Sequence, residues 1–322
     1  MNTELILFNS DFEDLGVLTS DVDFEVGNSS ALNNFELHAV GLDAYGFYIE
    51  GTEYGGIFEY EAGGTNTDQL TLKGWTWRGL LSQSIITPPS GSDYRIVSGD
   101  AHTIMNSLLS GLLGGLFTVP NTSSGCTVSN YQFALYTTTL DGIMDMLATY
   151  GYRLYIHAEK ETVSSPIVIY AEAVEAETLD GTFTADSPVD MSYVFDGMGI
   201  NHLVCMGSGE LQQRMRKDLY INASGQVSTT KYYTGFHERT AYYDYSSAES
   251  MDDLTKYGTE RLLELASSKT ISIHAREENT LEVGDIVRAV KGGQMVTAPI
   301  VKKILKITQG AISQQYTVKG EN

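Results

Sequence analysis

The sequence predicts a β-rich α+β protein in which two β-barrel-like modules flank a small α+β insertion. Twenty tyrosines and 32 glycines against six prolines favour many strands joined by turns. The 322 residues, 42% of them apolar, are enough for two or three modules with substantial cores. Strand-like stretches towards both ends enclose a middle region in which apolar residues recur at helical spacing.

The first module is expected over residues 1–88. ELILFN and FELHAV mix apolar and polar positions with a short period, and GFYIEGTEYGGIFEYEA contains two aromatic strands joined by a turn. A further strand begins near Leu70 and becomes helical after Trp77. We expect Trp75 and Trp77 to fill the core, and a sugar-stacking pair is the alternative.

The insertion is expected over residues 89–185, because Pro88-Pro89 and Ser-Gly-Ser interrupt the preceding pattern. Asp100 is placed to cap a helix that Gly114-Gly115 ends. The apolar stripe of that helix consists of Ile104, Leu108, Leu109 and Leu112.

A second helix of the insertion is expected in TTLDGIMDMLATYG, where Gly151 is its C-cap. The segments YRLYIHA and PIVIYAEAV, which follow it, have the composition of a pair of strands. Together these elements predict two helices and a few strands between the flanking modules.

The second module is expected over residues 186–322. GINHLVCMGSG and QRMRKDLYIN form a strand, a turn and a return strand, followed by the turn NASGQ. A helix is predicted at about 250–268, where Ser250 precedes two acidic residues and a Leu-rich stripe. Three strands and a closing hairpin, turning at Gln309-Gly310, complete the module.

His202 and Cys205 raise the question of a metal or thiol site. The two residues point to opposite faces if they lie on one strand, and the only other cysteine, Cys126, has no His or Cys near it in the sequence. A zinc site is therefore disfavoured, while a Cys–His nucleophile assembled by the fold stays open. We expect two free thiols, which favours assembly in a reducing compartment.

The stretch GSGELQQRMRK lacks the Gly-Lys-Ser/Thr ending of a phosphate-binding loop. Its basic residues suit a solvated strand face or a row of salt bridges between subunits. A set of acidic residues lies among aromatic residues, as in a sugar-binding cleft. Pairs of acidic residues occur throughout so acidic a chain, however, and are therefore weak evidence of glycoside chemistry. This set consists of Asp43, Glu50, Glu53, Glu59 and Glu61. We predict no catalytic, cofactor-binding or metal-binding residues, no cofactor, and no enzymatic activity.

The charge of the chain disfavours stable binding of nucleic acid. The net charge is −21, and residues 1–200 carry 27 acidic and 5 basic side chains, against 14 and 15 in residues 201–322. Such a surface is either simply solvated or lines a passage along which DNA slides without sticking. No apolar run approaches the ~20 residues of a membrane-spanning helix, and the acidic N-terminal stretch is not a signal peptide.

Several segments, in this order, resemble the tail-tip hub family of siphoviruses and prophages, tail-associated or baseplate-hub-like proteins of Gram-positive hosts. They are NFELHAVG, YTTTLDGIMDMLATYGYRLYI, NHLVCMGSGELQQRMRKDLYINASGQV, YDYSSAES and LEVGDIVRAV with the closing hairpin. The resemblance spans most of the chain and is most specific over residues 201–227. The long C-terminal extension that many tail-associated proteins carry is missing from this sequence, which puts receptor-binding and lytic roles in doubt.

The resemblance implies a virion structural protein at the distal tail tip. Such hubs form homotrimers whose two similar modules present six near-equivalent units to a hexameric tube. The implied partners are further copies of the chain, the distal tail or tube protein, the tape-measure protein and host-binding components. The implied location is the virion tail, assembled in the bacterial cytoplasm. The alternatives are a tail module that binds or degrades cell-wall glycan and a hub of another contractile injection apparatus.

Overall fold

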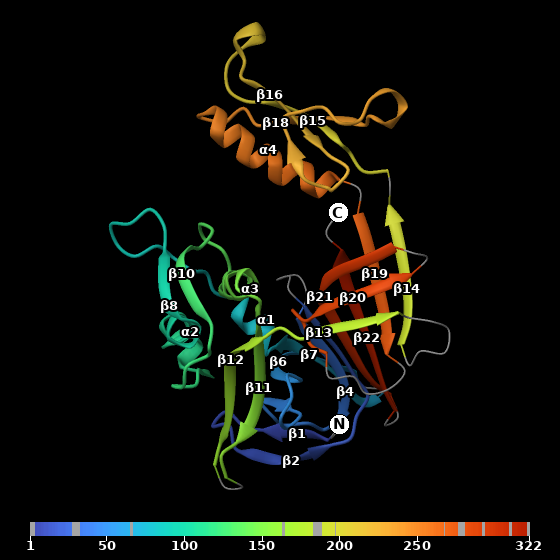
Figure 1. Cartoon of the computed structure of the whole chain (residues 1–322). Helices are drawn as coiled ribbons and strands as arrows, with labels where there is room; N and C mark the ends of the chain where they lie inside the picture. Colours follow the sequence, from blue (N-terminus) through green and yellow to red (C-terminus); the bar gives the residue numbers. More distant parts are fainter. Residues whose placement is uncertain are drawn as a thin grey trace. The chain divides into compact units, whose positions relative to one another are not determined.

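The computed structural model describes residues 4–27, 33–64, 67–162, 165–182, 189–196, 198–266, 268–275, 281–291, 294–308 and 311–320. The chain forms two compact units. Unit 1 combines Met1–Met191 with Ser272–Val318, and unit 2 comprises Ser192–Ile271 with Lys319–Asn322. The chain therefore leaves unit 1, builds unit 2 and returns to complete unit 1 (Figure 1).

One large sheet organises unit 1. Its N-terminal strands are β1 (Leu5–Phe8), β2 (Asp14–Leu18), β3 (Val22–Gly27), β4 (Asn34–Val40), β5 (Gly46–Tyr48), β6 (Gly55–Gly64) and β7 (Thr67–Thr76). Its C-terminal strands are β13 (Thr178–Thr182), β14 (Val189–Asp196), β19 (Ser268–Ala275), β20 (Ile286–Lys291), β21 (Gln294–Thr308) and β22 (Ala311–Gly320). Strands β14 and β19 extend across the boundary between the two units.

The order of neighbouring strands joins the two ends of the chain in this sheet. Among the described strands it runs β14, β19, β22, β21, β3, β4, β7, β6, β5, β1, β2, while β20 pairs with both β21 and β13. β21 lies antiparallel to β3, with Ile307 opposite Val22. The predicted closing hairpin is confirmed, because β21 and β22 pair antiparallel up to Thr308 and Ala311; its turn lies outside the described residues.

Alternation of buried and outward-facing side chains explains why these segments form strands with one core face. In β4, Phe35, Leu37 and Ala39 are buried and the intervening residues are more exposed. The rings of Phe24 and Phe47 pack on Phe35, with centroids 6.0 and 4.9 Å away. The core of the N-terminal strands is therefore aromatic, as the composition predicts.

The middle of the chain forms an α+β region within unit 1, here called the insertion, which begins within the range predicted for the first module. Its helices are α1 (Trp77–Leu81), α2 (Ala101–Leu109), the 3₁₀ turn η1 (Leu112–Gly114) and α3 (Thr139–Thr149). Its strands are β8 (Ile96–Asp100), β9 (Phe117–Thr118), β10 (Thr127–Gln132), β11 (Tyr152–Lys160) and β12 (Ile167–Glu175). β11, β12 and β9 form a three-stranded sheet, and β8 pairs with β10.

The helix ends follow the sequence signals with one difference. Asp100 caps α2 as predicted, because its carboxylate accepts the backbone N–H of His102 at 2.9 Å. The helix ends at Leu109, earlier than predicted, because Gly111 adopts a left-handed conformation (φ 76°) and starts a separate 3₁₀ turn. Gly151, also left-handed, follows the end of α3.

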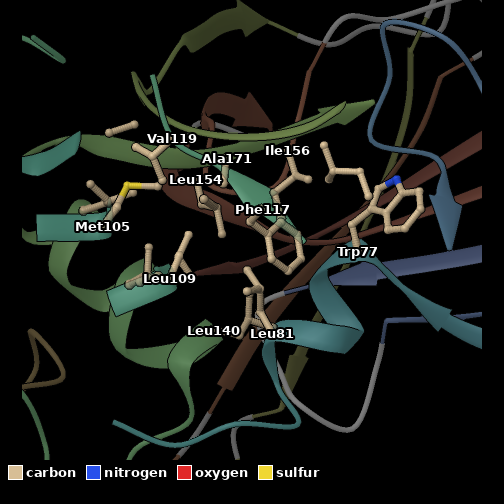
Figure 2. Packing of buried hydrophobic residues seen from close by; sticks show 14 of the residues in the cluster. Trp77, Leu81, Met105, Leu109, Phe117, Val119, Leu140, Leu154, Ile156 and Ala171 are labelled. Atoms are coloured by element: carbon tan, nitrogen blue, oxygen red, sulfur yellow. The ribbon is translucent and has the colours of Figure 1, made fainter. Parts of the chain in front are cut away.

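The largest apolar cluster fills the space between these helices and the β11–β12 sheet (Figure 2). Met105 and Leu109 of α2 and Leu140 of α3 are fully buried in it. Leu154 and Ile156 point into the same cluster from β11. Met105 therefore serves as core packing.

Unit 2 is a four-stranded sheet packed against one helix. Its strands, in the order β17, β16, β15, β18, are β17 (Val227–Ser228), β16 (Arg216–Ile221), β15 (His202–Met206) and β18 (Thr240–Asp244). Its helical segments are η2 (Leu211–Gln213), η3 (Gly235–His237) and α4 (Met251–Leu265). Ser250 caps α4 as predicted, by accepting the N–H of Asp253 at 3.1 Å. Within the described ranges, no helix is long and apolar enough to cross a membrane.

The predicted β-rich α+β class is confirmed. The compact units are divided differently from the predicted modules, because strands expected to form one module at 186–322 contribute to both units. β15 to β18 belong to unit 2, whereas β20 to β22 join the sheet of unit 1. The three ranges 1–88, 89–185 and 186–322, and the repeat of the first in the third, stay a prediction.

Candidate functional site

His202 and Cys205 lie on opposite faces of β15, as the strand prediction requires. Cys205 is fully buried and faces α4. A Cβ on Gly258 of α4 would lie 2.6 Å from the Cys205 Sγ, so only glycine allows the helix to approach this closely. Burial raises the pKa of the Cys205 thiol to about 11. Cys205 is therefore a core residue, and His202 is not its partner.

Cys126 is also a free and buried thiol, so the prediction of two free cysteines is confirmed. Burial raises the pKa of this thiol as well. No group of three or more His, Cys, Asp or Glu side chains in the described part of the chain is arranged to hold a metal ion.

The ring of His202 lies between two carboxylates on the other face of the sheet. Its Nδ1 is 2.8 Å from the Glu238 Oε1, and its Nε2 is 2.9 Å from the Asp218 Oδ1. Each carboxylate also contacts a basic side chain: Arg216 contacts Asp218 at 2.9 Å and Lys231 contacts Glu238 at 2.6 Å. This row of polar contacts ties β15 and β16 to the segment before β18. Its members, in order, are Arg216, Asp218, His202, Glu238 and Lys231.

The electrostatics of this row favour ionised carboxylates. The hydrogen bond from Arg216 holds the pKa of Asp218 below its usual value, and His202 adds to this effect. The hydrogen bond from Lys231 lowers the pKa of Glu238, again with help from His202. The row is a structural clamp, because each carboxylate is held both by a basic side chain and by the ring of His202.

The clamp holds one exposed segment, residues 229–239, which we call the aromatic loop. Asn201 anchors its C-terminal end: the side-chain amide donates to the His237 carbonyl at 2.8 Å, and the amide oxygen accepts the Arg239 N–H at 2.9 Å. Within the loop, Tyr232 is 56% exposed and Phe236 is 87% exposed. A loop that is tied down at its base and carries exposed rings is suited to contact a partner.

The aromatic loop was missed by the sequence reasoning. The signal for it is KYYTGFHER, which places four aromatic or imidazole rings in six consecutive residues without strand or helix periodicity. The basic residues singled out nearby are used within the chain. Arg214 bonds the Gly207 carbonyl at 2.8 Å and pairs with Asp244. Two of the salt bridges proposed between subunits are therefore formed inside unit 2, by Arg214 and Arg216.

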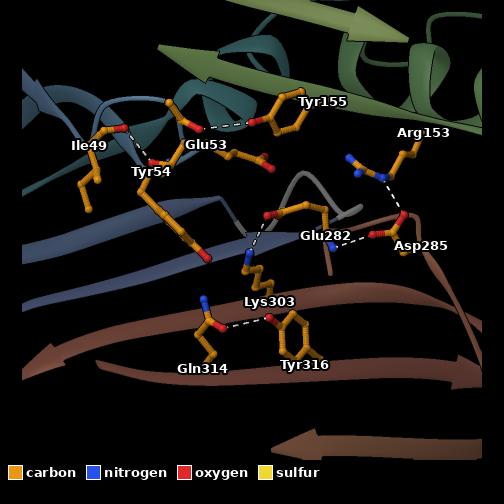
Figure 3. A network of polar contacts seen from close by, with 12 residues as sticks. Ile49, Glu53, Tyr54, Arg153, Tyr155, Glu282, Asp285, Lys303, Gln314 and Tyr316 are labelled. Atoms are coloured by element: carbon orange, nitrogen blue, oxygen red, sulfur yellow. Dashed lines mark hydrogen bonds and ion pairs between the residues drawn. The ribbon is translucent and has the colours of Figure 1, made fainter. Parts of the chain in front are cut away.

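Unit 1 contains a second polar cluster, which is buried (Figure 3). Arg78 of α1 pairs with Glu53, and their side chains are 0% and 1% exposed. The Arg78 Nη2 also donates to the Leu154 carbonyl of β11 at 2.7 Å. These contacts join the N-terminal strands to the insertion.

Two further buried ion pairs involve the C-terminal segment of unit 1, and one of them, Arg153–Asp285, joins this segment to β11 (Figure 3). Lys303 of β21 contacts Glu282 at 2.8 Å, and Arg153 of β11 contacts Asp285 at 2.6 Å. The Lys303 ammonium lies 5.0 and 5.7 Å from the ring centroids of Tyr54 and Tyr316. Burial raises the pKa of Glu282. The closed surroundings make this cluster a tie between chain segments.

The structure does not bring the acids singled out in the sequence into a cleft. Glu53 is buried in its pair with Arg78, whereas the others are exposed. These others are Asp43, Glu50, Glu59 and Glu61. Trp77 is fully buried, and Trp75 is partly buried against the same core. The prediction that the tryptophans fill the core is confirmed, although Trp77 starts α1 instead of ending a strand.

Comparison with known proteins gives no match by sequence: no protein-family profile matches the chain, and no curated protein does. Its fold matches that of solved phage tail and baseplate proteins over nearly all of both chains. The tail protein from Neisseria meningitidis MC58 aligns over 99% of this chain and 96% of its own, with 12% identity and a TM-score of 0.52. The 43 kDa tail protein of prophage MuSo2 from Shewanella oneidensis aligns over 98% of each chain, with 11% identity and a TM-score of 0.54.

The p2 virion baseplate in its activated conformation contains a chain with the same fold. It aligns over 99% of each chain, with 11% identity and a TM-score of 0.54. At these identities the comparisons establish a shared fold. The fold expected from the resemblance of the sequence is therefore confirmed, and the neighbours of this structure are phage and prophage tail proteins and baseplate components.

Proposed function

We propose that this chain is a non-catalytic structural protein of a phage or prophage tail, located at the distal tip. In this role it forms a hub that closes the tail tube and connects it to the host-binding parts. The observation that carries the proposal is the fold, which aligns over nearly the full length of both chains with tail and baseplate proteins. Because fold and function are separable, the proposal also rests on the character of the polar sites.

Those polar sites support an architectural role. The ion pair Arg78–Glu53 is closed to solvent, the ion pair Lys303–Glu282 is mostly buried, and His202 is held by two carboxylates. Such satisfied groups fix the geometry of a subunit. The neighbour in prophage MuSo2 is described as a tail protein and that in p2 as part of a virion baseplate. A location in the virion tail follows for this chain under the proposal, with assembly in the bacterial cytoplasm.

The proposed partners are other copies of the chain in a trimer, the distal tail or tube protein, the tape-measure protein and host-binding components. A closed ring of identical chains around a tube requires repeated contacts of this kind. The acidic surplus of residues 1–200 suits a surface that DNA passes without binding. The glycan alternative gains no support from the acids and tryptophans singled out above, which are scattered or buried.

The test is a deletion in the phage or prophage that encodes the chain. We expect mass spectrometry to find the chain in purified particles, and electron microscopy of the deletion to show tails without a closed tip. Expression of the chain from a plasmid should restore the tip. Intact, infectious tails in the deletion strain would contradict the proposal. Release of sugar from purified peptidoglycan by the isolated chain would contradict its non-catalytic part.

A further inference from the structure

We propose that the aromatic loop, residues 229–239, docks on the edge strand β2 of a second copy of the chain. The inference rests on the proposed function, because a tail-tip hub requires several copies around one tube. It names a surface on each side of the contact. Both surfaces are exposed in the described structure and complement each other in charge and in apolar content.

The loop presents rings and positive charge on an ordered frame. Phe236 and Tyr232 are mostly exposed, and the exposed side chain of Arg239 lies at the end of the loop. The frame is held by Asn201, by the His202–Glu238 contact at 2.8 Å and by the Lys231–Glu238 ion pair. A loop ordered before binding loses little conformational entropy in the complex. Exposed aromatic and Arg side chains are the types enriched at the centres of interfaces.

Strand β2 is the complementary surface. Among the described strands it has one neighbour, β1, and it ends the order of the sheet. Its outward side chains Leu15 and Val17 are 52% and 57% exposed. The strand itself contains neither lysine nor proline, the residues that commonly guard the edge strands of proteins that stay monomeric, and Lys160 of β11 contacts only its first residue, Asp14, among the ion pairs of the described residues.

The turn before β2 adds negative charge in an ordered position. The exposed residues Asp11 and Glu13 donate their backbone N–H groups to the Asn9 side chain at 2.9 and 3.0 Å. The carboxylate of Asp14 is already engaged by Tyr48 and Lys160 within the chain. Glu13 also accepts the side-chain amide of Asn9 at 3.1 Å, a neutral donor that leaves its negative charge in place. Asp11 and Glu13 are therefore the acids placed to meet Arg239 of another copy, while Leu15 and Val17 meet the rings.

The two surfaces differ, so the contact is heterologous: each copy offers its loop to one neighbour and its β2 edge to the other. Heterologous contacts close into rings when the rotation between copies allows it. The occupant is therefore a second copy of this chain. A partner that carries only one of the two surfaces would leave the other uncovered.

Charge reversal with rescue tests the pairing by sedimentation equilibrium of the full-length chain, up to about 100 µM. We expect Arg239→Glu and Glu13→Arg each to weaken self-association at least about tenfold, and the two combined to recover most of it. Phe236→Ser should weaken association by a similar factor. Lys256→Glu, the same charge change on α4 outside the loop, is the matched control and should associate as the wild type does. All four positions are exposed, and thermal unfolding checks that the variants fold.

Three outcomes would overturn the inference. One is a wild-type chain that keeps the 35.3 kDa monomer mass at every concentration. Another is single variants that associate as strongly as the wild type. The third is a combined variant that associates no better than the single ones, which would remove β2 as the docking surface. The proposed function is tested separately on purified particles, so a tail-tip protein whose copies meet through other surfaces would be recognised as such.

Discussion

Replacement of Arg78 by methionine is expected to destabilise unit 1 strongly, because it leaves the Glu53 carboxylate buried without its cation. Arg78 and Glu53 have side chains 0% and 1% exposed. Besides the contact of its Nε with one Glu53 oxygen, the guanidinium donates to the other at 3.2 Å and to the Leu154 carbonyl at 2.7 Å. Methionine keeps an unbranched apolar side chain that fills the inner part of the site, so the change removes the charge and hydrogen bonds of the guanidinium while retaining much of the volume.

The magnitude follows from what becomes unpaired. Breaking a buried ion pair by removing one partner costs about 3–5 kcal/mol, against about 5–15 kcal/mol for the total stability of a typical domain. With a urea dependence of about 3 kcal/mol per M, the unfolding midpoint should fall by about 1–1.7 M. The loss should be smaller when Glu53 is also replaced by methionine, because no unpaired charge then remains in the core.

Equilibrium unfolding in urea, followed by tryptophan fluorescence, measures this effect in unit 1 alone. Both tryptophans of the chain, Trp75 and Trp77, belong to that unit, and Trp77 precedes Arg78 in α1. Lys73→Met is the control, because the Lys73–Glu36 pair at 2.6 Å is exposed and its loss should leave the midpoint unchanged. The reasoning is refuted if Arg78→Met shifts the midpoint no more than Lys73→Met does, or if the double variant is the least stable of all.

Three further outcomes are expected. Gly258→Ala should destabilise unit 2 by about 1–3 kcal/mol in thermal unfolding, because the new Cβ would lie 2.6 Å from the Cys205 Sγ. Cys205→Ala alone should cost about 1–2 kcal/mol. In the double variant, Cys205→Ala should recover part of the stability lost through Gly258→Ala. Neither cysteine should react with an alkylating reagent at neutral pH until the chain is unfolded, because burial raises both pKa values, that of Cys205 to about 11; rapid labelling of the native chain would contradict this. The pKa values of Asp218 and Glu238 are lowered in the folded chain, so these two groups contribute stability above their ordinary values of 3.8 and 4.5 and lose it as the pH falls below these values. The melting temperature of unit 2 should therefore drop in this acidic range, and it should drop less in Asp218→Asn. An equal drop in both proteins would point to other groups.

Local signals in the sequence predicted the local structure well. The strand–turn–strand pattern around Gly207 appears as the antiparallel pair of β15 and β16, and Asp100 and Ser250 cap the helices that follow them. Each of these features depends on residues close together in the chain, which periodicity and capping rules detect. The placement of His202 and Cys205 on opposite faces of β15 followed in the same way from the alternation of side chains along a strand.

The buried ion pairs were not predictable, because their partners lie far apart in the sequence. Arg153 and Asp285 are separated by 132 positions, and nothing in either local sequence marks the other. Glu53 was grouped with exposed acids because its burial depends on Arg78, 25 positions later. The aromatic loop was missed for a related reason: tyrosine and phenylalanine usually fill cores, and their exposure in KYYTGFHER is decided by the anchors around Asn201.

The return of the chain to unit 1 has a consequence for the order of events during synthesis. A nascent chain that ends at residue 271 already contains all of Ser192–Ile271, yet it lacks β21, the strand that pairs with β3. Until the last segment emerges from the ribosome, the edge of β3 stays open and Arg153 lacks Asp285. The main part of unit 2, Ser192–Ile271, is thus ready to fold before unit 1 is complete. Premature termination between residue 272 and the end of β22 would release a chain with an unfinished sheet, which is a species prone to aggregate.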